Sequence, residues 1–147
     1  MIYTPLTKKA LKLSFNSHKD QTDKTGMPYV FHPFHLAESM DDEISTVCAL
    51  LHDVVEDTDT TLEDLSEMGF PSEVIEVLTL LTHADGVPYM DYVREIAKNP
   101  TATKVKIADL KHNSDLSRMD EDMIDEYALK RTEKYKAALA ILTSEPK

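Results

Sequence analysis

The sequence predicts one all-helical domain. The 147-residue chain contains only three glycines and lacks the two-residue turn signals that close β-hairpins. Apolar residues instead recur at spacings of three and four, the period of an α-helix that is buried on one face. A chain of this length, with 41% hydrophobic residues, can build one ordinary domain with its own core. No repeat, linker or low-complexity segment divides it, so we expect residues 1–147 to form a single helical domain.

The first part of the chain predicts three helices. Thr4 followed by Pro5 is typical of a helix start, and this helix should extend over residues 5–17. Residues 18–31 form a predicted loop, after which a short helix should begin at Pro33. The next helix should span residues 42–57. Its buried stripe is marked by apolar residues at helical spacing: Ile44, Val47, Cys48, Leu51 and Val55.

Two helices should follow directly. Thr60 and Glu63 form a capping-box pattern for one of them, and Gly69 should end it. Pro71 should open the second. Its predicted inner residues are Val74, Val77, Leu78 and Leu81.

Three helices should complete the domain. One is expected over residues 89–98, before Asn99-Pro100, and Thr101 should cap another that reaches about Asn113. The longest should span residues 121–142. Its predicted inner face consists of Ile124, Tyr127, Ala128, Tyr135 and Leu139.

The charge of the chain limits its partners. The formal net charge is -11, and such a surface repels the phosphates of DNA and RNA. We therefore expect no nucleic-acid partner. The same field would repel a small phosphorylated substrate unless a bound cation reverses it locally.

Several features favour the cytoplasm. Cys48 is the single cysteine and lies in an apolar run, so it is expected to be a small core residue in a reducing compartment. Residues 1–5 lack the basic and apolar regions of a signal peptide. No apolar run approaches the roughly 20 residues that span a bilayer, and we expect no membrane partner.

The segment Leu50–Thr58 carries the most informative pattern. Residues four apart share a helix face, so His52 should lie beside Glu56 and Asp53 beside Asp57. Three carboxylates would then crowd onto one strip of an apolar helix, and burying like charges without compensation costs several kcal/mol. A divalent cation is the simplest compensation. The alternative is an amphipathic helix whose strip faces water.

Two further residues fit a metal site. His32 stands between apolar residues in Phe31-His32-Pro33-Phe34, and Asp109 is an acid in the apolar run Val105–Leu110. Taken singly, His32 is better explained as a packed core residue and Asp109 as a surface or capped acid. The combination of His32, His52-Asp53 and Asp109, each in apolar surroundings, is much rarer by chance.

These residues carry a resemblance to a known family. The order His32…His52-Asp53…Asp109 resembles the metal site of the HD phosphohydrolase superfamily. More specifically, the chain resembles the hydrolase domain of the RelA/SpoT alarmone enzymes and their small stand-alone relatives, from about His18 to Asn113. The synthetase half of the long members is absent, so synthesis is not expected. The matching stretches are 18–21, 26–33, 49–58, 106–109 and 112–113.

The resemblance implies a reaction and a cofactor. It implies one divalent metal, usually manganese, on His32, His52, Asp53 and Asp109, with iron, cobalt or zinc as alternatives. Two imidazoles and two carboxylates suit manganese, iron or cobalt better than a closed structural zinc site. The resemblance also implies that the Glu56-Asp57 pair serves the attacking water. The implied reaction removes the 3′-pyrophosphate from guanosine tetra- or pentaphosphate.

The substrate side shows both matches and departures. Lys24 and Thr25 belong to the expected substrate loop. Asp23 stands where the family usually has a basic residue that helps to hold the guanine base, and Leu110 replaces a usual arginine, for which Lys111 is a partial substitute.

Several other polar residues keep two interpretations. His18 either lines the substrate pocket or caps the first helix, and Asn113 either holds the ribose or a phosphate or ends its helix. A solvated face is favoured over a phosphate site for the last basic cluster. This cluster consists of Lys130, Arg131 and Lys134. The remaining histidines show no spacing expected of metal ligands; they are His35, His83 and His112.

Two other functions remain open from the sequence. The same scaffold could act on a nucleotide monophosphate or a dinucleotide phosphate, which the missing basic residues favour. A non-catalytic nucleotide-binding regulator is the second alternative, and the intact Glu56-Asp57 pair argues against it. The oligomeric state cannot be read from the sequence.

Overall fold

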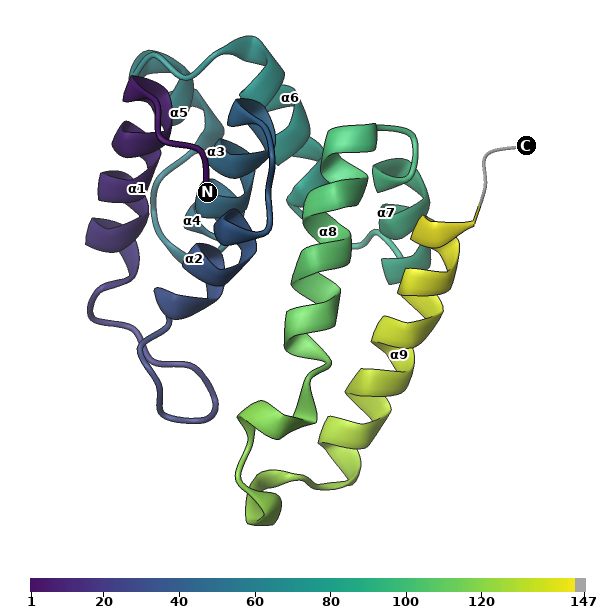
Figure 1. The fold of residues 1–147 in the computed structure, drawn as a ribbon. Coiled ribbons are helices and arrows are strands. Elements are labelled where there is room, and N and C mark those ends of the chain that lie inside the picture. Colours follow the sequence, from purple (N-terminus) through teal and green to yellow (C-terminus); the bar gives the residue numbers. More distant parts are fainter. Residues whose placement is uncertain (145–147) are drawn as a thin grey trace.

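Helices account for all regular structure in the part of the chain that the computed structural model describes, residues 1–144 (Figure 1). Within it, a single isolated bridge between Thr22 and Pro28 is the only strand-like pairing, so the prediction of an all-α fold is confirmed. None of the described helices is long and apolar enough to cross a membrane. The helices are α1 (Pro5–His18), α2 (Phe31–Glu38), α3 (Glu43–Leu51), α4 (Val54–Asp57), α5 (Leu62–Glu67), α6 (Ser72–Leu81), α7 (Tyr89–Ile96), α8 (Pro100–Asn113), η1 (Leu116–Arg118), η2 (Glu121–Met123) and α9 (Glu126–Thr143).

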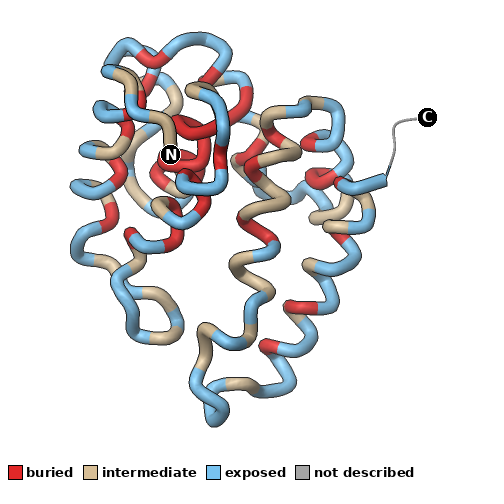
Figure 2. Tube along the Cα trace, in the orientation of Figure 1, coloured by how far each residue is buried: buried red, intermediate tan, exposed pale blue. Residues whose placement is uncertain are grey.

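The centre of the fold is α3. It packs against α1, α2, α6 and α8, and every residue from Ser45 to Leu51 is buried (Figure 2). The hydroxyl groups in this run do not remain without partners, since those of Ser45 and Thr46 both donate to the carbonyl oxygen of Asp42. Helix α9 lies further out, against α7 and α8. Residues on α2, α8 and the end of α3 are therefore held together by the core.

The first two helices begin with recognisable signals. Thr4 caps α1 as predicted, and its side chain accepts a hydrogen bond from the amide of Thr7 at 3.1 Å. Helix α2 begins at Phe31, two residues before the predicted start at Pro33. Proline is tolerated there because the first amides of a helix have no intrahelical partner.

The predicted helix over residues 42–57 is wrong in one respect, because it is interrupted at His52 and Asp53. The ring of His52 approaches the carbonyl oxygen of Ala49 through Nδ1 at 2.7 Å. A continuous helix would offer that oxygen to the amide of Asp53, so the ring competes with the helix for its acceptor. Past the interruption, Glu56 and Asp57 are exposed rather than buried on one strip.

The starts of two later helices also differ from the predictions. The capping box uses Thr61 and Asp64, one residue beyond Thr60 and Glu63. Asn99, not Thr101, caps α8, and its side chain accepts from the amide of Ala102 at 3.0 Å. Asparagine is as good a cap as threonine, and Pro100 suits the first turn of a helix, so the local sequence favours this earlier start.

The last helix starts later than predicted. Residues from Glu121 to Met123 form the short η2, and α9 begins at Glu126 with Asp125 as its cap. Tyr127 is 67% exposed, so it does not belong to the predicted inner face, whereas Ala128 is buried there. The aspartate cap outweighs the apolar spacing that favoured an earlier start.

A substitution at Leu110 can test how α8 packs against the core. Its side chain is 1% exposed inside the main core. We expect Leu110→Ala to lower the free energy of unfolding by about 2–5 kcal/mol, because it leaves a cavity. Chemical denaturation should measure this, with the exposed neighbour Lys111→Ala as matched control, within about 0.5 kcal/mol of wild type. Equal stability of the two variants would contradict a core position for Leu110.

Candidate metal centre and substrate cavity

Four predicted metal ligands meet in one cluster. His32 comes from α2, His52 and Asp53 from the junction of α3 and α4, and Asp109 from α8, and one ligand atom of each lies within 4.8 Å of the others. The Nε2 atom of His32 is 2.8 Å from Oδ1 of Asp109, and Nε2 of His52 is 2.9 Å from Oδ2 of Asp53. The fold thus brings together residues that are up to 77 positions apart in the sequence.

The cluster is buried. His32, His52 and Asp109 are only 3–6% exposed, and the side chain of Asp53 is 14% exposed. Charged groups are rarely removed from water to this extent without a compensating partner. The four candidate ligand atoms therefore form a buried polar centre, as expected for an ion site.

The orientation of His52 fits a metal. Its Nδ1 is turned to the carbonyl oxygen of Ala49, which can only accept a hydrogen bond, so Nδ1 carries a proton and Nε2 is the nitrogen available to a metal. Nε2 is buried and points into the cluster, where it makes no hydrogen bond of suitable geometry although Oδ2 of Asp53 is 2.9 Å away. A metal ligand has this arrangement, with the outer ring nitrogen held by a backbone carbonyl. The cluster is accordingly suited to a divalent ion.

Charges around Asp109 favour its ionised form. Burial opposes ionisation, but Lys106, whose Nζ donates to Oδ2 at 2.8 Å, and the two histidines hold the pKa of Asp109 well below its usual range. Asn113 donates to Oδ1 at 3.1 Å. The second carboxylate, Asp53, accepts a hydrogen bond from the hydroxyl of Tyr29. Both carboxylates are thus oriented by partners outside the cluster.

The predicted catalytic pair lies just beyond the ligands, on α4. Glu56 accepts a hydrogen bond from the amide of His83 at 2.9 Å. Burial raises the pKa of Glu56, and the negative charge of Asp53 raises it further. The hydrogen bond from His83 acts in the opposite direction and lowers it. Burial and Asp53 likewise raise the pKa of Asp57. The negative charge of Asp53 thus contributes to the raised pKa of both carboxyl groups, although both residues are exposed.

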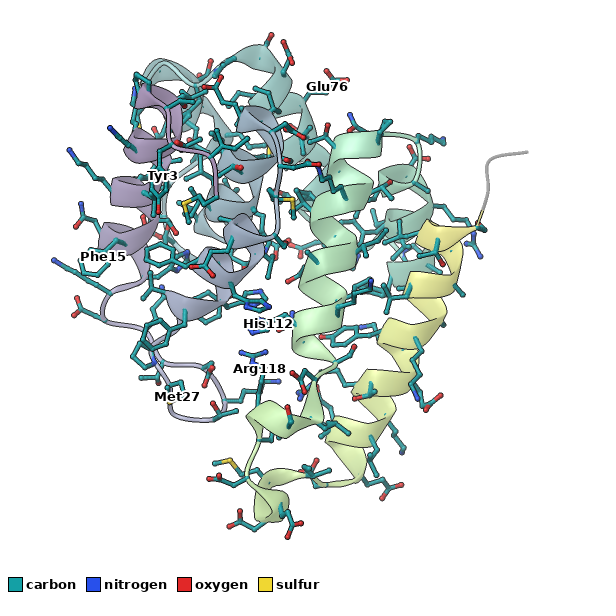
Figure 3. The ribbon with its side chains drawn as sticks, in the orientation of Figure 1. Tyr3, Phe15, Met27, Glu76, His112 and Arg118 are labelled. Carbon is teal, nitrogen blue, oxygen red and sulfur yellow. The ribbon has the colours of Figure 1, made fainter. Side chains whose placement is uncertain are left out.

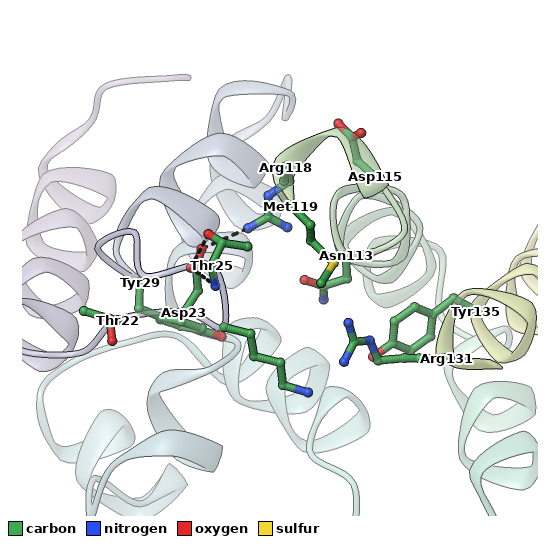
Figure 4. A pocket seen from close by; sticks show the side chains of 11 residues that line it. Thr22, Asp23, Thr25, Tyr29, Asn113, Asp115, Arg118, Met119, Arg131 and Tyr135 are labelled. Atoms are coloured by element: carbon green, nitrogen blue, oxygen red, sulfur yellow. Dashed lines mark hydrogen bonds and ion pairs between the residues drawn. The ribbon is translucent and has the colours of Figure 1, made fainter. Parts of the chain in front are cut away.

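A cavity of about 340 Å³ adjoins the cluster (Figure 4). Two lining residues join it to the metal ligands, since Tyr29 donates to Asp53 and Asn113 donates to Asp109. The volume falls in the range of small-molecule sites. The lining residues are Thr22, Asp23, Lys24, Thr25, Tyr29, Asn113, Asp115, Arg118, Met119, Arg131 and Tyr135.

Asp23 is tied into the wall of this cavity. Its Oδ1 accepts from the amide and hydroxyl of Thr25 at 2.8 and 2.6 Å, and its Oδ2 faces a guanidinium nitrogen of Arg118 at 3.4 Å. Burial opposes its ionisation, but these partners and the amide of Met27 lower its pKa. The Asp23 carboxylate is therefore occupied by hydrogen bonds within the protein, and the guanidinium of Arg118 places a positive charge beside it.

The predicted substrate residues separate into two groups. Lys24, Thr25 and Asn113 line the cavity. His18 does not, because it is fully buried at the end of α1, 2.8 Å from Oε1 of Gln21, with its ring 5.0 Å from that of Tyr29. Leu110 lies in the core and so has no place on the substrate side.

Several residues of the site were not predicted from the sequence. Tyr29 and Lys106 lie inside the stretches that carried the resemblance, where a polar group beside a predicted ligand was the available signal. Arg131 belongs to the basic cluster assigned to solvent. It lines the cavity, whereas Lys130 is paired with Glu126 on the surface. The other missed residues are Arg118, Tyr135 and His112, whose Nδ1 is 2.6 Å from that of His32.

The helical fold and the His, His-Asp and Asp set define an HD-type metal hydrolase domain. No family model matches the chain. It is 32% identical over 124 residues to the mouse protein named guanosine-3′,5′-bis(diphosphate) 3′-pyrophosphohydrolase MESH1, covering 75% of this chain and 69% of that one. The chain belongs to the family of these 3′-pyrophosphohydrolases.

Two bacterial relatives are much longer. The chain is 32% identical over 113 residues to an Aquifex aeolicus protein with the same activity in its name, and 32% identical over 96 residues to the Escherichia coli protein named bifunctional (p)ppGpp synthase/hydrolase SpoT. These matches cover 69% and 63% of this chain but only 16% and 14% of the relatives. The chain thus spans a small part of such proteins.

A solved structure shares the fold. It is described as a metazoan ortholog of SpoT that hydrolyzes ppGpp and plays a role in starvation responses. The TM-score is 0.75 at 23% identity, over 97% of this chain and 88% of the other. The arrangement of helices over nearly the whole chain is therefore that of a known hydrolase structure.

Removal of one ligand should remove the metal. We expect about one transition-metal ion per purified chain, and His52→Ala should lose most of it because the variant lacks one of the two imidazole donors. Elemental analysis checks this. Chelation should lower the melting temperature of wild type, by mass action, but not that of His52→Ala. Full metal content in the variant would exclude His52 as a ligand.

Proposed function

We propose that the protein is a metal-dependent hydrolase that removes the 3′-pyrophosphate from guanosine tetra- or pentaphosphate. The observation that carries the proposal is the contact between a buried His/His-Asp/Asp cluster and a cavity of about 340 Å³, through Tyr29 and Asn113. The names of the related proteins supply the substrate. We further propose that residues 1–147 act as one catalytic domain, in the cytoplasm.

His32, His52, Asp53 and Asp109 would hold the ion, and manganese is the proposed one, with iron, cobalt or zinc as alternatives. A bound divalent ion lowers the pKa of water and polarises a phosphoryl oxygen. It would also offset the repulsion between a substrate rich in phosphates and a chain of formal net charge -11. The ligand set favours a catalytic over a structural site, because it contains no thiolate.

The Glu56 and Asp57 carboxylates are proposed to orient the attacking water and take its proton. A general base works best when its pKa approaches the working pH, and the raised pKa of both groups moves them in that direction. The water oxygen then adds to the phosphorus that carries the 3′ oxygen, and the bond between this phosphorus and the 3′ oxygen breaks. The 3′ oxygen takes up a proton, and the products are the guanosine 5′-di- or triphosphate with a free 3′ hydroxyl, and pyrophosphate.

The cavity is proposed to hold the nucleoside. Lys24, Arg118 and Arg131 bring positive charge to its wall, and Thr25 and Asn113 bring hydrogen-bonding groups for the sugar or a phosphate. His18 is not part of this proposal as a contact residue, because it is buried away from the cavity. We propose that its ring supports Tyr29 instead.

One observation favours a second candidate. Asp23 occupies a position that is usually basic in the family. Its carboxylate already accepts hydrogen bonds from Thr25 in its own loop and from Arg118. A hydrolase of the same scaffold with another nucleotide as substrate therefore stays an alternative. A substrate panel with manganese present, read by product identity, separates the two.

The catalytic pair can be tested without disturbing the ligands. Glu56→Gln and Asp57→Asn keep the shape of each side chain, so metal content should stay near that of wild type. Turnover should fall by about 10²–10⁴-fold, the usual loss when general acid–base help is removed. Product release from guanosine tetraphosphate measures it, and the exposed Glu76→Gln on α6 is the control. Wild-type turnover in both variants would refute the assigned roles.

Arg118 provides a test of the cavity. Loss of a charge-assisted contact typically weakens binding by about tenfold to a hundredfold, so Arg118→Ala should raise KM by that amount with a smaller change in kcat. Arg94→Ala is a matched control, because Arg94 is exposed and its guanidinium pairs with Asp91 on the same helix. Steady-state kinetics on the preferred substrate gives both constants. An unchanged KM would exclude Arg118 from the substrate site.

A further inference from the structure

His32 is held at both ring nitrogens. Its Nε2 faces the cluster, 2.8 Å from Oδ1 of Asp109. Its Nδ1 points the other way and lies 2.6 Å from Nδ1 of His112, which comes from α8. Figure 3 shows His112 between α2 and α8, above Arg118. The outer partner of this predicted ligand is therefore a second imidazole.

The geometry is that of a hydrogen bond in the plane of the rings. The two rings are nearly parallel, at 7°, and their centroids are 4.9 Å apart. Rings in face-to-face contact would not bring two nitrogens to 2.6 Å at this centroid distance, whereas coplanar rings joined edge to edge would. At this distance one nitrogen must carry the proton and the other the lone pair, because two protons would collide and two lone pairs would repel.

The direction of this hydrogen bond decides what His32 can bind. A neutral imidazole has one N–H and one lone pair. His32 can therefore offer the Nε2 lone pair to a cation, in place of a proton shared with Oδ1 of Asp109, only when its own proton sits on Nδ1. Nδ1 of His112 must then be the acceptor, and the proton of the His112 ring sits on Nε2. His52 reaches the same state differently, with the carbonyl oxygen of Ala49 as its partner. A carbonyl can only accept, whereas an imidazole can do either, so the identity of residue 112 matters.

His112 is itself well placed for this role. It stands three residues after Asp109 on α8, so one helix supplies a ligand and the support of another ligand. Its ring stacks on that of His35 from α2, with centroids 4.1 Å apart at 21°. Its backbone carbonyl oxygen accepts from Arg118 at 2.9 Å. The ring thus has contacts that limit its rotation.

We propose that His112 is a positioning residue that accepts the Nδ1 proton of His32 and thereby presents the Nε2 lone pair of His32 to the metal. The inference rests on the proposed metal site but not on the identity of the substrate. It assigns a use to a histidine whose spacing in the sequence indicated none. It also makes α8 the support of two of the four ligands, one directly and one through a ring.

Metal affinity of the complete chain tests the proposal. His112→Phe keeps a planar ring and removes the acceptor, whereas His112→Gln restores an acceptor through its amide oxygen. Competition with a chromogenic chelator for Mn²⁺ or Co²⁺ gives the dissociation constants. We expect binding about 10–100-fold weaker for His112→Phe, as for other outer partners of metal ligands, with substantial recovery in His112→Gln. His35→Phe is the control, because it keeps a stacked ring and His35 contacts no ligand, and it should bind as wild type does.

The absorption spectrum of the Co²⁺ form gives a second reading, because its bands report ligand geometry. They should change in His112→Phe and return in His112→Gln. Should His112→Phe fail to fold, His112→Met, similar in length to glutamine but a poor acceptor, replaces it in the comparison. Equal affinity and equal spectra in the acceptor-lacking variant and wild type would overturn the role of His112. Absence of metal binding by wild type would instead overturn the metal site itself.

Discussion

The burial of two carboxylates beside two imidazoles constrains the rest of this structure. Asp53 and Asp109 lie where water is largely excluded, and such charges persist only when their surroundings compensate them. Lys106, Tyr29 and Asn113 supply part of the compensation, each with a hydrogen bond to one carboxylate. The helices that carry these groups must therefore keep a fixed relation to one another, or a charge would lose its partner inside the core.

The same groups connect the cluster to the cavity. Tyr29 and Asn113 each face a ligand on one side and the cavity on the other. A substrate that fills the cavity would thus contact side chains whose orientation depends on the ligands. The central helix α3 provides the rigid base for this arrangement, since its residues from Ser45 to Leu51 are buried and the ligands follow at its end.

Much of the fold and of the ligand set could be predicted from the sequence, because both depend on local patterns. Apolar spacing located the helices, and the combination of histidines and acids in apolar runs predicted His32, His52, Asp53 and Asp109 as candidate ligands, which the fold brings into one cluster. Exact boundaries were less accessible. The end of α3 depends on a ring that competes for a backbone oxygen, and the start of α9 depends on which of several acids becomes the cap.

The residues that were missed act through tertiary contacts. Nothing in the spacing of His112 shows that its ring meets His32 across 80 positions, and nothing around Asp23 shows that Arg118 will face it across 95. The burial of Leu110 could not be predicted either. A leucine at a position that is usually charged in the family does not by itself show whether the side chain points into the core or toward the substrate. Such relations appear only once the helices are packed.

The cavity and the metal cluster differ in the kind of structure that carries them. The candidate ligands His32 and Asp109 lie on helices, and the other two follow the central helix directly. Asp23, Lys24 and Thr25, in contrast, lie on the loop between α1 and α2, and Arg118 follows α8 at the end of η1. Loops accept sequence changes more readily than packed helices do. Substrate preference in this scaffold could therefore be retargeted by exchanging loop residues alone, while the hydrolytic centre is inherited unchanged.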